Sequence, residues 1–239
     1  VADGEGTLVY TMSGTPTTSG TASFAIVLGG KTCSINIKVE DVAQIIGKPG
    51  PNITDVEGNS YKTVTIGSQT WMAENLKTSK YNDGSLIINV KDSIEWIKLT
   101  TGAWSYYNND ENNNAKYGKL YNWYAISATT NGDKNVCPSG WHVPSADEWK
   151  VLINYLGGEY FAGNKMKEVC TNSWISPNTE ATNISLFSAI PSGTRDYEGK
   201  YGGLGSSCHW WASIFSTSCE IGWGLSNYEG RIRNGCWGK

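Results

Sequence analysis

The segment PSADEWKVLINYLGG, residues 144–158, constrains the fold more than any other stretch of this sequence. Ser145 and Glu148 have the spacing of a capping box, in which each side chain accepts a hydrogen bond from the other residue's backbone N–H group. The apolar residues that follow recur on one face of a helix: Trp149, Leu152, Ile153 and Leu156. Gly157 and Gly158 can take the left-handed conformation that ends a helix. The segment therefore predicts a helix with one buried face.

Elsewhere the apolar patterns are short. A strand is predicted through Tyr61–Ile66, and further short strands are predicted within residues 79–107. Helical spacing of Leu120, Trp123 and Tyr124 predicts a second helix over about 117–127, after a polar loop rich in Asn, and a short helix is expected near Gly163–Val169. The predicted fold class is α+β, with two helices, short mixed sheets and long loops.

The amino-acid composition divides the chain into three regions. Residues 1–47 contain three Thr-, Ile- and Val-rich runs, TLVYTM, TASFAIVL and KTCSINIKV, and predict a small β-rich region that resembles part of an immunoglobulin-like module. The stretch IIGKPGPNITD, residues 45–55, contains two prolines and two glycines, and residues 48–54 within it are the predicted linker. Residues 55–239 then form the predicted main domain.

Charge and cysteine usage exclude several classes of protein. The net charge of −3 argues against a nucleic-acid partner, which requires a concentrated Lys and Arg surface. No apolar run approaches the roughly 20 residues of a membrane span, and no signal peptide begins the chain, so the signal of an exported protein would lie outside it. The six cysteines form no CxxC pair and only two histidines are present, so no metal and no cofactor is predicted. Disulfides and unpaired thiols both remain open.

Several long motifs occur in a characteristic order: DVEGNSYKTVTIGSQTWMAENLKTSKYNDG, YYNNDENNNAKYGKLYNWYAI, CPSGWHVPSADEWKVLINYLGG, SPNTEATNISLFSAIPSGTRDYEG and the pair Trp210-Trp211. Over roughly residues 54–239 the chain resembles the Fibrobacter succinogenes major paralogous domain family, found mostly in surface proteins of the Fibrobacter and Bacteroides groups. The resemblance implies a C-type-lectin-like fold, similar also to the formylglycine-generating enzymes, and an exported protein at the cell surface or outside the cell. It further implies that the family chain continues past the equivalent of Lys239, where a partner for Cys137 would lie.

The last 34 residues differ most from the family pattern. Where the family usually reads Trp-Trp-Ser-Ser-Thr-Glu, this chain reads WWASIF at 210–215. Such replacements are what a diversity-generating retroelement leaves in the last codons of a gene for a variable protein. The apolar scaffold residues are predicted to face inward, with Arg231 and Arg233 outward on either side of Ile232. These scaffold residues are Trp141, Trp149, Trp211, Leu225 and Ile232.

The sequence accordingly predicts a non-catalytic binding module, possessing a variable ligand surface at about 206–238 for an unidentified protein or glycan. Large aromatic and Arg side chains in this stretch are the types enriched at binding hot spots. The predicted ligand-binding residues are Ser207, Cys208, His209, Ile214, Phe215, Ser216, Ser218, Glu220, Trp223, Ser226, Tyr228, Glu229, Arg231, Arg233, Cys236 and Trp237.

Two other classes of function stay open. The domain could be a structural component of a cell surface, pilus or adhesin, anchored there and without a diversified site. An enzyme related to the formylglycine-generating group is the third reading, but neither histidine has a nucleophile motif beside it, and no cysteine pair matches that group residue by residue. The calcium-binding triplets of sugar-binding lectins of this fold are also missing from the sequence.

Overall fold

The computed structural model describes residues 20–28, 31–39, 45–169, 173–213 and 221–236. The chain divides into two compact units, Val1–Ile45 and Ile46–Lys239. The first unit contains one antiparallel hairpin, β1 (Gly20–Leu28) and β2 (Lys31–Val39), which pair from Gly20 with Val39 to Leu28 with Lys31. Two of the three strands predicted here are thus confirmed, and the third, TLVYTM, lies outside the described residues.

The second unit begins with a strand where a linker was predicted. Strands β3 (Gly47–Thr54), β4 (Ser60–Ile66) and β5 (Gln69–Met72) form an antiparallel sheet in that order, so the linker assignment of 48–54 was wrong. β3 lies at the edge of this sheet, where a proline without an N–H group is tolerated, and a register shift between Gly50 and Ile53 relieves the pairing around Pro51. The Asp55 carboxylate stabilises the following turn by accepting from the Tyr61 hydroxyl at 2.6 Å.

A second small sheet contains β6 (Ile88–Asn89), β7 (Ala103–Ser105) and β8 (Leu120–Tyr121). Between β6 and β7 the chain forms a short helix, α1 (Ser93–Ile97), where only strands were predicted. Asp92 explains it, because its side chain accepts from the Glu95 N–H group as an N-cap. Two 3₁₀ turns, η2 (Tyr107–Asn109) and η3 (Glu111–Asn113), occupy the Asn-rich segment predicted as a loop.

The single helix predicted over 117–127 is wrong, because two local signals divide that segment. Gly118, with φ of 71°, ends α2 (Asn114–Tyr117), and the chain then enters β8. Asn122 is extended and caps the short helix α3 (Trp123–Ile126), accepting from the Ala125 N–H group. A further short helix, α4 (Ala128–Asn131), follows.

The helix predicted at 144–158 is confirmed as α5 (Ala146–Tyr155), complete with its capping box. Trp149, Leu152 and Ile153 are buried on its inner face. The next helix, α6 (Glu159–Met166), begins four residues earlier than the expected start at Gly163 and has no side-chain cap. Only α5 and α6 have eight residues or more in the described part of the chain, and the α+β class is confirmed.

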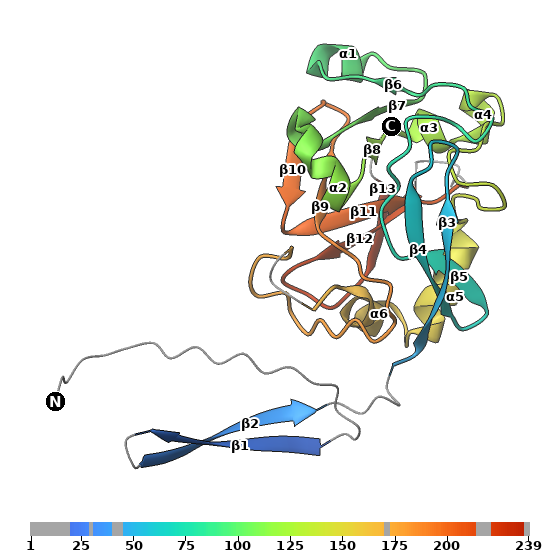
Figure 1. The fold of residues 1–239 in the computed structure, drawn as a ribbon. Helices are drawn as coiled ribbons and strands as arrows, with labels where there is room; N and C mark the ends of the chain where they lie inside the picture. Colours follow the sequence, from blue (N-terminus) through green and yellow to red (C-terminus); the bar gives the residue numbers. More distant parts are fainter. Residues whose placement is uncertain (1–19, 29–30, 40–44, 170–172, 214–220, 237–239) are drawn as a thin grey trace. The chain divides into compact units, whose positions relative to one another are not determined.

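The largest sheet has the strand order β10-β9-β11-β12-β13 and lies at the centre of the second unit (Figure 1). Its strands are β9 (Ser192–Arg195), β10 (Tyr201–Leu204), β11 (Ser207–Trp211), β12 (Ile221–Ser226) and β13 (Arg233–Cys236). β11 is parallel to β9 and antiparallel to β12, so most of the sheet comes from the C-terminal segment. The sequence predicted few of these strands individually.

Two apolar clusters make up most of the core. The first joins β4, β5, α5 and the central sheet and includes Trp71, Trp149, Phe187 and Trp223. The second lies around β7 and α3 and includes Tyr81, Trp104 and Cys137. Tilted and edge-to-face aromatic pairs add to the area that is buried, for example Trp71 with Trp149 at 4.9 Å between ring centroids.

Buried Lys167 holds the C-terminal segment to the rest of the domain. Its side chain is fully buried, and Nζ donates to the main-chain oxygens of Thr179 at 2.9 Å, Ser226 at 3.2 Å and Glu229 at 3.0 Å. The three N–H donors of an ammonium group are thereby matched by three acceptors. Burial nevertheless lowers the pKa of Lys167 to about 8, because the charged form is poorly solvated there.

Candidate ligand-binding cleft

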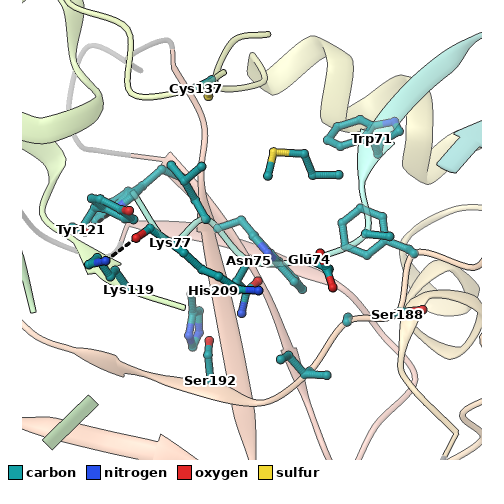
Figure 2. A pocket seen from close by; sticks show the side chains of 18 of the residues that line it. Trp71, Glu74, Asn75, Lys77, Lys119, Tyr121, Cys137, Ser188, Ser192 and His209 are labelled. Atoms are coloured by element: carbon teal, nitrogen blue, oxygen red, sulfur yellow. Dashed lines mark hydrogen bonds between the residues drawn. The ribbon is translucent and has the colours of Figure 1, made fainter. Parts of the chain in front are cut away.

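A cleft of about 910 Å³ opens in the second unit and takes its walls from both apolar clusters. Its volume falls in the range of small-molecule sites, roughly 300–1,000 Å³. Figure 2 shows Cys137, Trp71, Tyr121 and His209 around it. The segments that line it are distant in sequence: 71–77, 115–121, 136–144, 186–196 and 209–211 among others.

Aromatic side chains line the cleft, and Trp210 and Trp211 leave β11 on opposite faces of the strand. Trp210 is half-buried, with its ring centroid 5.7 Å from that of Trp149 and 5.6 Å from that of Phe187. Trp211 is half-buried as well; its indole N–H donates to the Tyr121 carbonyl at 2.9 Å, and its ring meets Trp123 edge to face. The aromatic wall of the cleft at Trp210 is therefore held by packing on Trp149 and Phe187, and Trp211 is held by a hydrogen bond.

Two lysines, Lys77 and Lys119, lie at one end of the cleft. The Lys119 Nζ stands 4.6 Å from the centroid of the Trp104 ring and 5.5 Å from that of Tyr106, and it donates to the Lys77 carbonyl, as drawn in Figure 2. Burial lowers the pKa of Lys119, and the negative charge of Glu57 acts in the opposite direction. Among the described residues, no carboxylate forms an ion pair with Lys77 or Lys119.

His209 extends from β11 to the floor of the cleft and is kept neutral. Burial lowers its pKa to about 4, so the imidazole carries no charge at physiological pH. Gly224 faces it across the strand pair, and a Cβ at that position would lie 2.5 Å from His209 Cδ2. The glycine on β12 therefore makes the space that the imidazole occupies.

The Cys137 thiol also lines the cleft and is unreactive. Burial raises its pKa to about 12, so the reactive thiolate is scarce at neutral pH. Burial likewise raises the pKa of the Cys208 thiol, and both residues have unbonded thiols. No group of three or more His, Cys, Asp or Glu side chains capable of holding a metal occurs in the described ranges.

Several predicted site residues are exposed, and four side chains form a surface we call the Tyr–Arg patch: Tyr160, Tyr228, Arg231 and Arg233. Tyr228 is 68% exposed, and the Arg231 guanidinium lies 4.6 Å from the centre of the Tyr160 ring. Arg231 pairs with Glu159 at 3.0 Å, and Arg233 makes two bonds of 2.7 Å to Glu229. Predicted exposure of Arg231 and Arg233 around a buried Ile232 is confirmed, with Arg231 only partly exposed.

Two of the predicted ligand-binding residues are buried, and their predicted exposure was wrong. Cys208 is 1% exposed and Trp223 is 2% exposed. In the paired strands Cys208 faces Leu225 and Trp210 faces Trp223, so all four side chains share the sheet face that packs on the first cluster. Leu225 was predicted to be buried, and Trp223, two positions before it in β12, must lie on the same face of the strand.

The other predicted residues have several fates. Ser207, Ser226 and Glu229 are partly buried, as is His209, and of these only His209 lines the cleft. The scaffold residues Trp149, Leu225 and Ile232 are buried as predicted, while Trp141 and Trp211 are half-buried. Ile214, Phe215, Ser216, Ser218, Glu220 and Trp237 lie outside the described residues, and Cys236 is placed only as the last residue of β13.

The lysines and most aromatic walls of the cleft were missed by the sequence reasoning. Lys77 and Lys119 come together from positions 42 residues apart. No local spacing connects them, and a lysine in a polar segment usually indicates only a solvated surface. Trp71 and Trp210 stand out in the sequence as tryptophans, but a tryptophan by itself predicts a buried core residue and not a residue that lines a cleft.

A known family model covers most of this chain. The model of the Fibrobacter succinogenes major domain matches residues 64–228, and the chain is a member of that family. Neither the search of curated proteins nor that of solved structures gave a match. In the described ranges, no helix is both long and apolar enough to cross a bilayer.

Proposed function

We propose that this chain is a non-catalytic, exported ligand-binding module with a C-type-lectin-like fold, displayed at the cell surface or released from it, and that its ligand occupies the cleft. The observation that carries the proposal is the composition of the cleft: half-buried aromatic faces beside a few amine, amide and imidazole groups, a pattern typical of small-ligand sites. His209, Trp210 and Trp211 connect it with the C-terminal segment that the sequence singles out.

Binding is favoured over catalysis by the state of the candidate reactive groups. The Cys137 thiol is protonated, and the His209 imidazole is neutral with a pKa too low for a base working near pH 7. His142 lies on the surface, where it contacts Glu148 at 2.8 Å near the start of α5. These are properties of a recognition surface and a helix terminus.

The Tyr–Arg patch supports a second candidate function, a surface component that associates through its exposed C-terminal residues. Tyr and Arg are enriched at protein interfaces, and residues 228, 231 and 233 belong to the stretch expected to vary under a diversity-generating retroelement. In this alternative the cleft plays no part. The two candidates therefore differ in which residues binding depends on.

Ala115→Trp and Ala128→Trp offer a matched pair of variants for testing the proposal. Both alanines are exposed and lie on short helices, but only Ala115 lines the cleft. Glycan and peptide arrays probed with the wild-type chain identify ligands, and A115W, A128W and Tyr228→Ala are then compared by calorimetry. We expect A115W to abolish binding while A128W and Y228A keep it. Loss in Y228A with retention in A115W would establish the patch instead.

A further inference from the structure

Lys119 in the cleft differs from Lys150, Lys167 and Lys200 in how its charge is satisfied. Lys167 has three carbonyl acceptors, and the surface residues Lys150 and Lys200 pair with Asp147 and Glu198. Lys119 has two aromatic faces and the single carbonyl of Lys77. An ammonium group has three donors and no acceptor, so Lys119 retains donor capacity for a ligand oxygen.

The carboxylates nearest to Lys119 moderate its charge but do not occupy its donors. Asp55, Glu57 and Glu111 act on it electrostatically. Both Glu57 oxygens already accept from Ser79, through its hydroxyl at 2.6 Å and its N–H group at 2.5 Å. The lysine end of the cleft therefore offers a partly buried positive charge with an unfilled hydrogen-bonding sphere.

Glu74 places a negative charge in the lining of the same cleft. Figure 2 shows Lys119 and Tyr121 on one side and Trp71 and Ser188 on the other, with Lys77, Asn75 and Glu74 between them. The Glu74 carboxylate accepts from the Lys62 N–H group at 3.1 Å. A ligand with one carboxylate is attracted to the lysines and repelled by Glu74, so this polarity fixes its direction.

The middle of the cleft fits a saccharide ring. A sugar presents one face of C–H groups, which packs on aromatic faces such as that of Trp210, and an edge of hydroxyls, which both donate and accept. The Asn75 side chain donates to the Tyr117 carbonyl at 3.0 Å, which leaves its Oδ1 as an acceptor beside the cleft. The volume suits a few sugar units and is too small for a folded partner.

We infer that the ligand of the cleft is an acidic saccharide, with its carboxylate at Lys119 and Lys77 and a sugar face on the aromatic wall at Trp210. The inference rests on the proposed function, because it names the ligand class of the same cleft. Charge-assisted hydrogen bonds to lysine supply the preference for the acid, and the aromatic wall supplies binding that the neutral sugar shares.

Matched glycans separate these two contributions. An array carrying oligosaccharides of galacturonate, glucuronate and sialate, each beside its carboxyl-reduced form, is probed with the wild-type chain. We expect an acidic member to bind about tenfold more tightly than its reduced form, the value of one charge-assisted hydrogen bond. Added salt weakens the acidic member selectively.

Lysine variants then assign the effect. Lys77→Gln and Lys119→Gln are expected to remove most of the acid preference and to leave affinity for the reduced sugar within about twofold, while Lys119→Arg retains the preference. Lys150→Gln is the control, because Lys150 is exposed and outside the cleft. Thermal unfolding verifies that each variant is folded. If K119Q does not fold, K77Q still tests the inference, because the main-chain carbonyl of residue 77 that accepts from Lys119 is kept in this variant.

Each contrary result has its own meaning. Equal binding of acidic and reduced sugars, or an acid preference that survives K77Q and K119Q, would overturn the inference. A ligand blocked by A115W that proves to be a peptide would overturn the saccharide class and leave the cleft as the binding site. Failure of every ligand to respond to A115W would remove the inference and the proposed function together.

Discussion

The cleft and the Tyr–Arg patch use similar side chains under opposite conditions. In the patch, Arg231 and Arg233 lie near solvent and are each paired with a glutamate. In the cleft, Lys77 and Lys119 are half-buried beside aromatic rings, and no carboxylate of the described chain pairs with them. Exposed, paired charges contribute little and are screened by salt, whereas a partly buried charge acts strongly on any group brought beside it.

The comparison shows that residue type alone is a poor guide to a binding site. By composition the patch is the better hot spot, since Tyr and Arg predominate there. By pairing the cleft is the better site, because no carboxylate of the described chain forms an ion pair with Lys77 or Lys119. The predictions below either separate these two regions or show that they behave alike.

The largest effect is expected from Lys167→Met. This change leaves three main-chain oxygens without their buried donor, and we expect the free energy of unfolding to fall by about 3 kcal/mol. Urea titration followed by tryptophan fluorescence measures it. Hydrogen exchange should accelerate at 226–229, next to the patch, and remain slow in β4 at the cleft. Equal acceleration in both regions would show that they are one cooperative unit.

Titration of Lys167 should have a smaller and gradual effect on the free energy of unfolding. The pKa of Lys167 is about 8 in the folded chain against 10.5 for an ordinary lysine. Above pH 8 the unfolded chain therefore holds a proton that the folded chain has lost, and stability rises with pH from about 8 toward 10.5. The K167M variant lacks this contribution, so its deficit should widen by up to about 1.4 kcal/mol per pH unit. Urea titrations of both proteins at pH 7.5 and 9.5 check it, and a constant deficit would contradict the shifted pKa.

Gly224→Ala should disturb the cleft and spare the patch. The added methyl would lie 2.5 Å from His209 Cδ2, so the imidazole must move, at a cost of about 1 kcal/mol in stability. Calorimetry should also show weaker binding of the cleft ligand. Gly202→Ala in β10 is the matched control, because a Cβ there meets open space. Similar melting temperatures for the two variants would mean that the imidazole adapts freely.

Arg233→Gln should have the smallest effect. It removes an exposed ion pair with Glu229, and the melting temperature should not change measurably. Affinity for the cleft ligand should be unchanged as well. A clear loss of that affinity would indicate that the patch and the cleft act as one surface.

The parts of the fold that were predicted correctly depend on short-range signals. The capping box of Ser145 and Glu148 and the apolar stripe after it place α5 within a few residues. The helix predicted over 117–127 failed on equally local signals, because Gly118 and Asn122 each end or begin an element. The linker failed because prolines that prevent a central strand are permitted at an edge.

The candidate site was less predictable. Burial of Trp223 followed from that of Leu225 by strand alternation, so this error was avoidable. The association of Lys77, Lys119 and His209 was beyond local reasoning, because it requires three separate elements to be placed around one cavity. Pairing of charges depends on that placement too, and no composition reveals it.

The hydrogen bonds from Lys167 to the C-terminal segment do not depend on which side chains that segment carries. Its ammonium group donates its hydrogen bonds to main-chain carbonyl oxygens, at Thr179, Ser226 and Glu229, and every amino acid supplies one. Codons 226 and 229 can therefore change freely as far as this anchor is concerned, while the main chain keeps its path. Side chains on a segment that is anchored through its main chain can be substituted one by one without loss of the anchor.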